Sequence, residues 1–479
     1  MQSVIPEVGG RWDRSSLLWQ GHGGRGSDWE QTSPLDGSVI QTVSLLDREE
    51  LDALVAWDTS MPAGGSDELR AFCLRLHAAL HEFAPLLEDA MLRETAFVRP
   101  DCREMVAAGL EFVQCFPDVA SGNDVGAVPI HYDVGSSRRQ IRLSSSPWGT
   151  IAVILPQNAF LVVALTCLIN ALHTGNRVIL RAPQQSARSA ALLAMAIKQA
   201  QLPPCLVSVV LTRAKDFVEA LCASDAPCLI HYMGSSAHAP SIMAQAFESG
   251  KGAIVDGQGN GWVYVAEDAD LGCATEILTR GALRYNGQTC TSINGAIIAP
   301  AIYPALRARL RDAWGQIPVG NPLSEDVAVG PLLDEAQAEH CLDLIRQAGA
   351  NILCGGSRVG NLLEPTLVET STPESRLVRE GFFGCALWIA EGTSDNFVSW
   401  WRRNRYPLCA GVLSTSAEPS RWQAQLSNLA RLTINGDPSV EHIHEPWGGY
   451  AASGSNPVSL WKHKYERVIQ IDQSVLPRC

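Results

Sequence analysis

The feature that most constrains the fold is a regular alternation of strand-like and helix-like segments between residues 148 and 236. Apolar runs typical of buried strands lie at residues 151–155, 177–180, 206–211 and 228–232, and helical patterns lie at 162–173, 186–200 and 215–223. Alternation at this spacing is typical of βαβ units, which build a parallel sheet covered by helices. We therefore predict an α/β fold with a parallel sheet of the dinucleotide-binding kind, although the fingerprint GxGxxG is absent.

The rest of the chain predicts further elements on both sides of this run. Residues 47–115 carry apolar residues at helical spacing, and the first 40 residues read as an irregular lead-in that ends in a turn at 33–37. A hairpin is predicted between residues 122 and 143. Later in the chain we expect helices at 271–286, 297–313 and 335–349, strand and turn at 353–356 and 363–369, and a last strand at 465–471.

Composition and charge exclude several classes of function. The 479 residues are 46% hydrophobic and 18% charged, as in an ordinary globular protein, and a net charge of −13 argues against binding to nucleic acid or an anionic membrane. The first residues lack a signal-peptide pattern, and the most apolar run, 151–172, is too interrupted to span a bilayer. With no CxxC among 14 cysteines, we expect reduced thiols in a cytoplasmic protein. His442 and His444 lack a third residue at ligand spacing, so we expect no metal site.

One cysteine stands in a context that fits catalysis. Residues 286–292 read NGQTCTS, which places Cys290 behind a Gly-Gln turn between hydroxyl residues. A thiolate is both a strong nucleophile and a good leaving group, so a positioned cysteine can form and release a covalent acyl intermediate. The alternative is that Cys290 is a small packing residue like most free cysteines.

Several short blocks decide between these interpretations. They are PWG at 147–149, PQN at 156–158, GN at 175–176, MGSS at 233–236, GQTC at 287–290, VGPL at 329–332, FG at 383–384, IN at 434–435 and PWGG at 446–449. In this order and spacing the chain resembles the aldehyde dehydrogenase superfamily over roughly residues 30–475, as a divergent member. Each block alone is weak evidence for the family, whereas the whole set in this order is specific for it.

The resemblance implies a catalytic site. Cys290 would attack an aldehyde carbonyl, and the Asn158 amide with the Cys290 backbone N–H would stabilise the oxyanion. Hydride transfer to a nicotinamide would then leave a thioester on Cys290. The alternative for Asn158 is a helix N-cap. The family places a glutamate base 34 residues before the cysteine, where this chain has Asp256, one methylene shorter. A family lysine on the first helix is replaced by Cys167.

The resemblance also implies a cofactor site for NADP or NAD. Its expected residues are Ile154, Leu155, Arg181, Gln184, Gly234, Ser235, Gly257 and Phe383. Gln184 stands where the family has a glutamate that binds the ribose hydroxyls and repels a 2′-phosphate, so NADP is admitted. Arg181 stands where the family has a lysine. Gly381 replaces the glutamate expected at the nicotinamide ribose, which removes a charge-assisted hydrogen bond.

By position, the substrate pocket would be lined by Ala159, Val163, Thr166, Arg284 and Tyr285, with a contribution from the loop just before Pro446. Arg284 suggests a substrate with a carboxylate or phosphate, because a guanidinium pairs with either group. The alternative is a surface arginine on a helix that runs toward the site.

We therefore expect three parts. Residues 1–122 and 143–256 would form the cofactor-binding domain, residues 257–445 an α/β catalytic domain, and residues 123–142 and 446–479 a small β oligomerisation flap that makes a homodimer or homotetramer. The predicted function is NAD(P)-dependent oxidation of a small-molecule aldehyde to a carboxylic acid. Two alternatives stay open: an enzyme in which coenzyme A or a carrier thiol accepts the acyl group, and a non-catalytic binding protein derived from the family.

Overall fold

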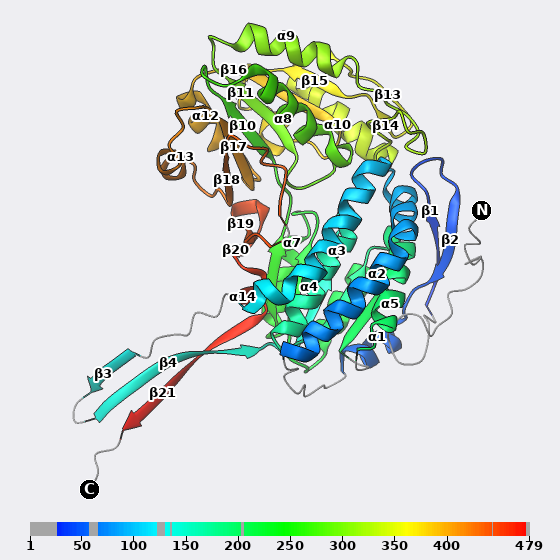
Figure 1. The fold of residues 1–479 in the computed structure, drawn as a ribbon, viewed down its shortest axis with the longest axis vertical. Helices are drawn as coiled ribbons and strands as arrows, with labels where there is room; N and C mark the ends of the chain where they lie inside the picture. The colour runs from blue at the N-terminus through cyan, green and yellow to red at the C-terminus, as the bar shows by residue number, and fades with distance from the viewer. Residues whose placement is uncertain are drawn as a thin grey trace.

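Two bodies of sheet and helix lie along the long axis of the molecule, and a narrow arm of strands projects from the lower one (Figure 1). The structure is a computed structural model that describes residues 26–56, 66–121, 130–134, 137–202, 206–442 and 444–475.

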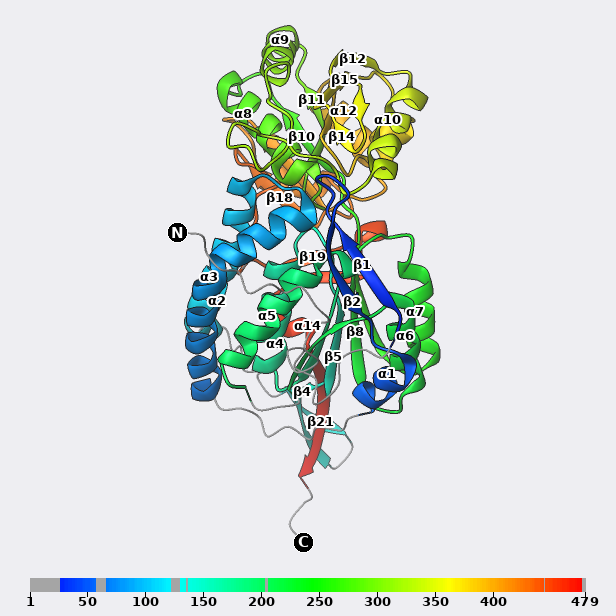
Figure 2. The same ribbon diagram turned by 90° about the vertical axis from the view of Figure 1, so that its right-hand side faces the viewer.

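The lower body is built on a five-stranded parallel sheet. Its order is β7 (Val207–Leu211), β6 (Arg177–Ala182), β5 (Thr150–Ile154), β8 (Cys228–Met233) and β9 (Gly252–Asp256). One face carries α4 (Phe160–His173) and α5 (Ala187–Gln199), and the other carries α6 (Ala214–Ala223) and α7 (Ala239–Glu248), as Figure 2 shows. Strands β5 to β8 are buried throughout because both faces are covered. The predicted α/β fold with a parallel sheet is confirmed.

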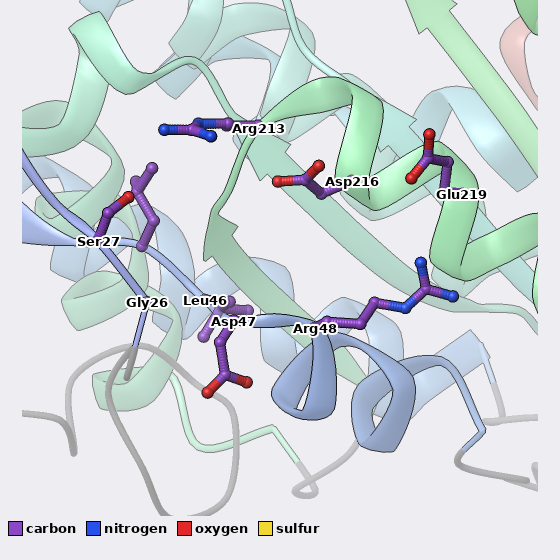
Figure 3. Close-up of a pocket in the computed structure, with 9 residues that line it drawn as sticks. Gly26, Ser27, Leu46, Asp47, Arg48, Arg213, Asp216 and Glu219 are labelled. Atoms are coloured by element: carbon purple, nitrogen blue, oxygen red, sulfur yellow. The ribbon is translucent and has the colours of Figure 1, made fainter.

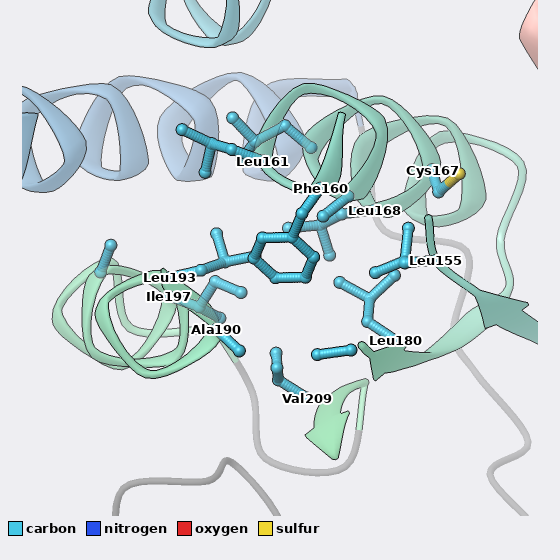
Figure 4. Close-up of a cluster of buried hydrophobic side chains, with 14 of the residues drawn as sticks. Leu155, Phe160, Leu161, Cys167, Leu168, Leu180, Ala190, Leu193, Ile197 and Val209 are labelled. Carbon is cyan, nitrogen blue, oxygen red and sulfur yellow. The ribbon is translucent and has the colours of Figure 1, made fainter. Parts of the chain in front are cut away.

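The start of α4 is fixed by its first residue. Phe160 is 3% exposed, and its ring points among Leu180 and Val209 of the sheet and Leu193 of α5 (Figure 4). Burial of such a ring contributes roughly 1.5–3 kcal/mol relative to exposure. The contact therefore also fixes the loop at residues 155–159, which precedes the helix.

The upper body is built on a seven-stranded sheet. Its order is β12 (Asn351–Cys354), β15 (Thr366–Glu369), β16 (Ala386–Glu391), β11 (Ile293–Ile298), β10 (Gly261–Val265), β17 (Cys409–Leu413) and β18 (Arg431–Ile434), with only β12 antiparallel to its neighbour among these strands. Its helices are α8 (Leu271–Leu283), α9 (Tyr303–Trp314), α10 (Glu335–Ala348), α11 (Arg376–Glu380), α12 (Ser394–Trp401) and α13 (Pro419–Gln425). In the core, the ring of Trp262 lies edge-on to Trp388 and Trp401, with centroids 5.1 and 5.6 Å away.

The first described residues form a hairpin and three helices on the lower body. These are β1 (Asp28–Thr32), β2 (Val39–Ser44), α1 (Arg48–Val55), α2 (Ser66–Thr95) and α3 (Arg99–Ser121). The predicted turn is present, with the Gly37 N–H donating to the Ser33 carbonyl (2.9 Å). The expectation of an irregular lead-in is wrong for residues 28–32, because antiparallel pairing with β2 makes that segment a strand. Residues 1–25 of the lead-in lie outside the described residues.

The projecting arm is a three-stranded antiparallel sheet in the order β21 (Glu466–Val475), β4 (Ser137–Pro147) and β3 (Ile130–Val134). It confirms the predicted hairpin and the last strand, although residues 122–129 and 135–136 lie outside the described residues. Smaller elements are β13 (Arg358–Val359) with β14 (Leu362–Leu363), β19 (Trp447–Gly449) with β20 (Asn456–Ser459), and α14 (Trp461–Lys464).

Two helix predictions are wrong at one end. The helix expected over 271–286 ends at Leu283, because the next residues turn into a short 3-10 segment, η2 (Arg284–Gly287), with left-handed backbone. The helix expected from residue 297 begins at Tyr303, because Ile297 belongs to the buried strand β11. A continuous apolar run does not distinguish a buried strand from a buried helix.

Candidate active site

Cys290 follows a backbone turn that residues other than glycine rarely adopt. Tyr285, Asn286 and Gly287 have φ values of 54°, 55° and 66°. Left-handed backbone at a bulky residue stores on the order of 1–3 kcal/mol and is typical of functional loops. A Cβ at position 287 would collide with the carbonyl of Gly384, so glycine is required there.

The strained turn is held by Asn286. Its amide nitrogen donates to the carbonyls of Ala96 (2.9 Å) and Pro331 (3.0 Å), and its amide oxygen accepts from the Gly330 N–H (2.9 Å). Asn286 is fully buried. The block VGPL at 329–332 is therefore explained: it supplies backbone partners that position the cysteine loop.

The Cys290 backbone is packed against a neighbouring segment. A Cβ at Gly259 would overlap the carbonyl oxygen of Cys290, which only glycine avoids. The Cys290 side chain stays partly exposed. Burial raises the pKa of its thiol well above the ordinary value, and the negative charges of Glu441 and Asp256 raise it further. The thiol form therefore dominates at neutral pH in the free protein.

Asn158 lies in the loop between β5 and α4. The N-cap of α4 is Ala159 and makes no side-chain capping bond, so the N-cap interpretation of Asn158 is excluded. Its side chain is partly exposed and makes no hydrogen bond to any described residue. The preceding Gln157 ties the loop to α2 by donating to the Glu94 carbonyl (3.0 Å). The amide of Asn158 is thus available to a ligand.

The Asp256 carboxylate is held by donors from two other elements. His231 Nε2 lies 2.6 Å from one oxygen, and Asn456 Nδ2 donates to both oxygens at 2.9 and 3.0 Å. The Tyr465 hydroxyl lies 2.8 Å from His231 Nδ1. Burial lowers the pKa of His231, and a neutral ring protonated at Nε2 fits both contacts.

Further residues extend this buried network. Lys464 Nζ donates to the amide oxygen of Asn456 (2.9 Å) and to the Trp447 carbonyl (2.7 Å), which orients the Asn456 amide toward Asp256. Burial lowers the pKa of Lys464 to about 8 and raises that of Cys167, which hydrogen-bonds with Tyr465, to about 12.

This hydrogen-bond network argues against a free, mobile carboxylate at Asp256. Both of its oxygens face donors, and its side chain is 7% exposed. Leaving a buried polar group without its partner costs roughly 1–3 kcal/mol, so swinging the carboxylate toward a thioester is opposed. The sequence analysis did not find His231, whose signal was a single polar residue within the otherwise apolar strand β8.

A second loop contacts the residue that follows Cys290. In the loop after β18, the Ser439 carbonyl accepts a hydrogen bond from Thr291 Oγ1 (3.2 Å). Glu441, an exposed residue, follows two positions later. From the sequence, only the loop before Pro446 as a whole could be assigned to this region, because no local pattern shows which of its residues lie near the cysteine.

Several of the expected cofactor residues lie at the carboxyl edge of the lower sheet. Ile154 ends β5, Leu155 follows it, and both are buried. Arg181 lies one residue before the end of the neighbouring β6 and donates from Nε to the Thr212 carbonyl (2.9 Å). Burial lowers the pKa of Arg181 to about 10. The strand order reverses between β5 and β8, and parallel α/β sheets bind ligands at such a reversal. At the same edge of the sheet, directly after β7, the hydroxyl of Thr212 is buried without a partner among the described residues, which fits a nucleotide.

Two of the expected glycines lie at the same edge. The Gly234 N–H donates to the Asp256 carbonyl (3.1 Å) and the Gly257 N–H to the Ser453 carbonyl (2.7 Å). A Cβ at Gly257 would collide with the Ser236 hydroxyl oxygen, so glycine is required for this close packing. Ser235 is exposed beside them.

Gln184 begins the 3-10 turn η1 (Gln184–Ser186) after β6 and is partly exposed. Phe383 is also partly exposed, and its carbonyl accepts from Gln337 Nε2 (2.9 Å). At Gly381, φ is 72° and a Cβ would collide with Asn294. The glutamate that the family has at this position cannot be accommodated here without rearrangement.

The expected substrate residues are only partly brought to an open surface. Val163 is partly exposed, but Thr166 is 2% exposed and its hydroxyl donates back to the Val162 carbonyl (2.9 Å). Arg284 forms a close ion pair with Glu104 and lies 4.7 Å from the Tyr285 ring centroid. A guanidinium already paired with a carboxylate weakens the case for an anionic substrate.

A separate pocket of about 330 Å³ lies away from the cysteine, at the outer edge of the lower sheet beyond β7 (Figure 3). Its charged lining residues are Asp47, Arg48, Arg213, Asp216 and Glu219. Carboxylates and guanidiniums are mixed there, so the pocket has no clear preference for an anion.

Within the described ranges, no three His, Cys, Asp or Glu side chains are grouped to hold a metal ion. None of the helices described is both long enough and apolar enough to cross a bilayer.

Comparisons with known proteins place the chain in a family. The model of the Aldehyde dehydrogenase family matches residues 20–473. Aspartate-semialdehyde dehydrogenase 1 of Pseudomonas canavaninivorans is 27% identical over 461 residues, covering 92% of this chain and 95% of the relative. Among solved structures, lactaldehyde dehydrogenase from Escherichia coli superposes with a TM-score of 0.86 at 20% identity, covering 95% and 96% of the two chains.

A glyceraldehyde-3-phosphate dehydrogenase from Methanocaldococcus jannaschii, solved in complex with NADP, superposes with a TM-score of 0.83 at 20% identity, covering 93% of this chain and 99% of that one. At this identity the solved structures establish the fold, while the family match extends over nearly the whole chain. The predicted enzyme class, an NAD(P)-dependent aldehyde dehydrogenase, is confirmed, and the chain belongs to the aldehyde dehydrogenase family.

Proposed function

We propose that Cys290 carries out NAD(P)-dependent oxidation of an aldehyde to a carboxylic acid, with water as the final acyl acceptor. The observation that carries this proposal is the strained, Asn286-anchored turn that holds Cys290 partly exposed. A cysteine that served only as packing would need neither the strain nor the exposure.

The chain's own residues account for the first half of the reaction. The Cys290 sulfur attacks the carbonyl carbon, and the Asn158 side-chain amide with the Cys290 N–H stabilises the resulting oxyanion. The nicotinamide of NAD or NADP, when bound, supplies the hydride acceptor. Leu155, Arg181, Gln184 and Gly234 would hold it at the carboxyl edge of the lower sheet. Oxidation leaves an acyl thioester on Cys290.

The second half of the reaction is hydrolysis. For this step we propose Asp256, the base predicted from the sequence. Its hydrogen bonds to His231 and Asn456 oppose a movement of the carboxylate toward the thioester. Transfer to coenzyme A or a carrier thiol is the alternative, since a thiolate attacks without a general base. Adding coenzyme A to a steady-state assay distinguishes them: a faster rate and an acyl-CoA product would contradict water as the acceptor.

Cys290→Ala tests the assignment directly. It should lower kcat more than about 100-fold, as loss of a nucleophile does, because no covalent intermediate can form. Nucleotide binding and the thermal unfolding midpoint should be unchanged, since the thiol holds neither cofactor nor core. The assay uses propanal, hexanal and benzaldehyde with both nucleotides. More than about a hundredth of the wild-type rate would contradict the role.

We also propose the three-part division set out above and a homo-oligomer formed through the β3–β4–β21 arm. Support for the oligomer comes from the exposed apolar residues on that arm, Leu143, Val468 and Ile469, which are 54%, 66% and 46% exposed. Exposed apolar side chains on a small sheet with two open edge strands favour association with another chain.

A further inference from the structure

A buried histidine that the proposed reaction does not use lies against the carboxylate assigned to hydrolysis. Strands β8 and β9 are parallel neighbours, and Asp256 pairs with Met233. Side chains two positions apart on a strand lie on the same face, so His231 and Asp256 are diagonal neighbours on one face of the sheet. His231 Nε2 lies 2.6 Å from Asp256 Oδ2. The contact is therefore a consequence of the register of the sheet.

The two oxygens of the Asp256 carboxylate have different surroundings. Oδ2 faces His231 and also accepts from Asn456 Nδ2 (3.0 Å), whereas Oδ1 has one donor among the described residues, Asn456 Nδ2 at 2.9 Å. A carboxylate oxygen has two lone pairs. Oδ1 therefore keeps one lone pair that no described residue uses, and a general base needs such a lone pair.

His231 is the donor in its contact with Asp256. An ionised carboxylate can only accept, so Nε2 carries the proton, and in a neutral ring Nδ1 is then an acceptor. The Tyr465 hydroxyl, 2.8 Å from Nδ1, can donate to it. Burial lowers the pKa of His231, which keeps the ring neutral at neutral pH. The tautomer is thus fixed from both sides of the ring.

Both solvent and the cysteine loop lie within reach of the aspartate. The Asp256 side chain is 8% exposed and that of His231 is 0% exposed, so of the two only the aspartate can meet water. Three residues after Asp256, a Cβ at Gly259 would overlap the carbonyl oxygen of Cys290. Three residues span at most about 10 Å. A water molecule can therefore connect the held carboxylate to the nucleophile's loop.

We propose that His231 is a positioning residue for hydrolysis of the Cys290 thioester, which holds Asp256 by Oδ2 and leaves Oδ1 to act on water. The water oxygen bonds to the acyl carbon while Oδ1 takes the water proton. The carbon–sulfur bond then breaks, its electron pair stays on sulfur, and the acid leaves. The carboxylate acts where it is held, so its hydrogen bonds stay intact. The proposal rests on the function proposed above, since it needs Asp256 as the base.

The test isolates deacylation with 4-nitrophenyl acetate, an activated ester that acylates a nucleophilic thiol without nucleotide or aldehyde. Stopped-flow absorbance of the full-length protein reads a burst of 4-nitrophenolate, which reports acylation, and then the steady rate, which reports deacylation. Mass spectrometry of peptides locates the acetyl group on Cys290. Acylation and hydrolysis are thereby measured separately in one experiment.

Two substitutions of His231 separate the donor at Nε2 from the rest of the ring. A glutamine amide reaches as far as Nε2 and can still donate to Asp256, whereas an asparagine amide reaches only as far as Nδ1. The steady rate of His231→Asn should fall at least tenfold, because misplacing a reacting group by about 1 Å costs up to 100-fold. That of His231→Gln should stay within about threefold of wild type. The burst should be kept in both variants.

Added 2-mercaptoethanol should restore the turnover of His231→Asn, because a thiolate attacks the thioester without a general base. A merely structural defect would not be corrected by a different acyl acceptor. The selective loss of hydrolysis is therefore the signature of a positioning role.

Asn176→Ala is the matched control. Asn176 is fully buried, and its amide donates to the Tyr465 carbonyl (2.9 Å) and accepts from the Gly149 N–H (3.0 Å). It therefore ties the same C-terminal segment to the sheet without a hydrogen bond to Asp256. The thermal midpoint of Asn176→Ala should fall, while its steady rate stays within about threefold of wild type.

The tautomer of His231 gives a readout that does not depend on how His231→Asn folds. Heteronuclear NMR of the wild type labelled at its histidine ring nitrogens should show one neutral ring, absent from His231→Gln, with its proton on Nε2 at neutral pH. A proton on Nδ1 of that ring would overturn the proposal, because Nε2 could then not donate to the carboxylate.

Three kinetic results would also overturn the proposal. The first is a His231→Asn steady rate within about threefold of wild type. The second is an equal loss in His231→Gln, and the third is an equal loss in Asn176→Ala. A steady rate that is unchanged in Asp256→Asn, or that survives Cys290→Ala, would show instead that the proposed function fails, and this proposal with it.

Discussion

At the scale of single residues, Gln184 has the clearest consequence for cofactor choice. It is partly exposed at the end of β6, where a carboxylate in the family would repel a 2′-phosphate. The neighbouring Arg181 is bound to the Thr212 carbonyl, so its guanidinium is already oriented toward the next strand. Neither residue excludes the extra phosphate of NADP.

We predict that the protein prefers NADP, or binds both nucleotides similarly, and that Gln184→Glu shifts the preference toward NAD. A new carboxylate repels the 2′-phosphate and accepts hydrogen bonds from a free ribose. Fluorescence titration of both nucleotides measures the ratio of Kd values, which should move about tenfold, or about 1.4 kcal/mol. Wild-type binding of NAD more than tenfold tighter than NADP would contradict the prediction.

At the scale of elements, short polar contacts set the ends of helices and turns. α5 begins without a capping side chain of its own, and Glu94 of α2 takes that place. Its carboxylate accepts from the Arg188 N–H (2.7 Å), the Ser189 N–H (3.2 Å) and Gln31 Nε2 (2.7 Å). A carboxylate at a helix N-terminus satisfies otherwise unpaired donors.

Glu94 should make stability depend on pH. Burial raises the pKa of its carboxyl to about 7, above the ordinary value of 4.5. The folded state therefore holds a proton that the unfolded chain has lost. This contribution is present below pH 4.5 and is lost as the pH rises to about 7.

The thermal midpoint of the wild type should accordingly fall relative to Glu94→Gln between pH 5 and 7, by the equivalent of roughly 1–3 kcal/mol. Above pH 7.5 the difference should stay constant. Scanning fluorimetry of both proteins across this range measures it. A difference that does not change with pH would show that the carboxyl is ionised throughout.

The left-handed turn before Cys290 gives a second prediction at this scale. Gly287→Ala adds a Cβ that collides with the Gly384 carbonyl, so the cysteine loop must shift. We expect kcat to fall at least tenfold, because misplacing a reacting group by about 1 Å costs up to 100-fold.

The matched control is Gly349→Ala at the end of α10. Gly349 has a similar φ of 58° but no atom within 4 Å of the added Cβ. It should lose stability by roughly 1 kcal/mol from the unfavourable backbone while keeping its activity. Equal loss of kcat in the two variants would show that the turn does not position Cys290.

At the scale of the whole molecule, the projecting arm connects the surface to the active site. β21 follows directly after Tyr465, which hydrogen-bonds to His231 and through it contacts Asp256. The C-terminal segment therefore both completes the arm and closes the buried network beside the carboxyl edge of the lower sheet. The network has a structural role in joining these parts.

The arm should mediate assembly. We expect the paired substitution Leu143→Lys with Val468→Lys to lower the oligomeric mass, because it places charges on the exposed apolar face of β4 and β21. Light scattering coupled to size-exclusion chromatography measures the mass. Val359→Lys is the control, since Val359 is 81% exposed on β13, outside the arm. An unchanged mass in the double variant would contradict assembly through this face.

The sequence alone determined the parallel sheet of the lower body and singled out Cys290 as the candidate nucleophile. Strand–helix alternation is a local pattern, and the family blocks keep their order along the chain, so neither needs knowledge of distant contacts. Even Gly287 and Asn286 could be singled out, because their motif is contiguous.

Only the tertiary structure decided what surrounds the cysteine. Asp256 and Asn456 are 200 positions apart, and Thr291 and Ser439 are 148 apart, so no local pattern could pair them. Whether a carboxylate is buried in hydrogen bonds or open to water depends on such pairings. Position along the chain indicated Asp256 as the base. The folded contacts bury Asp256 and bring the loop with Ser439 to Thr291, because hydrogen-bond partners are chosen by proximity in space and not by spacing in sequence.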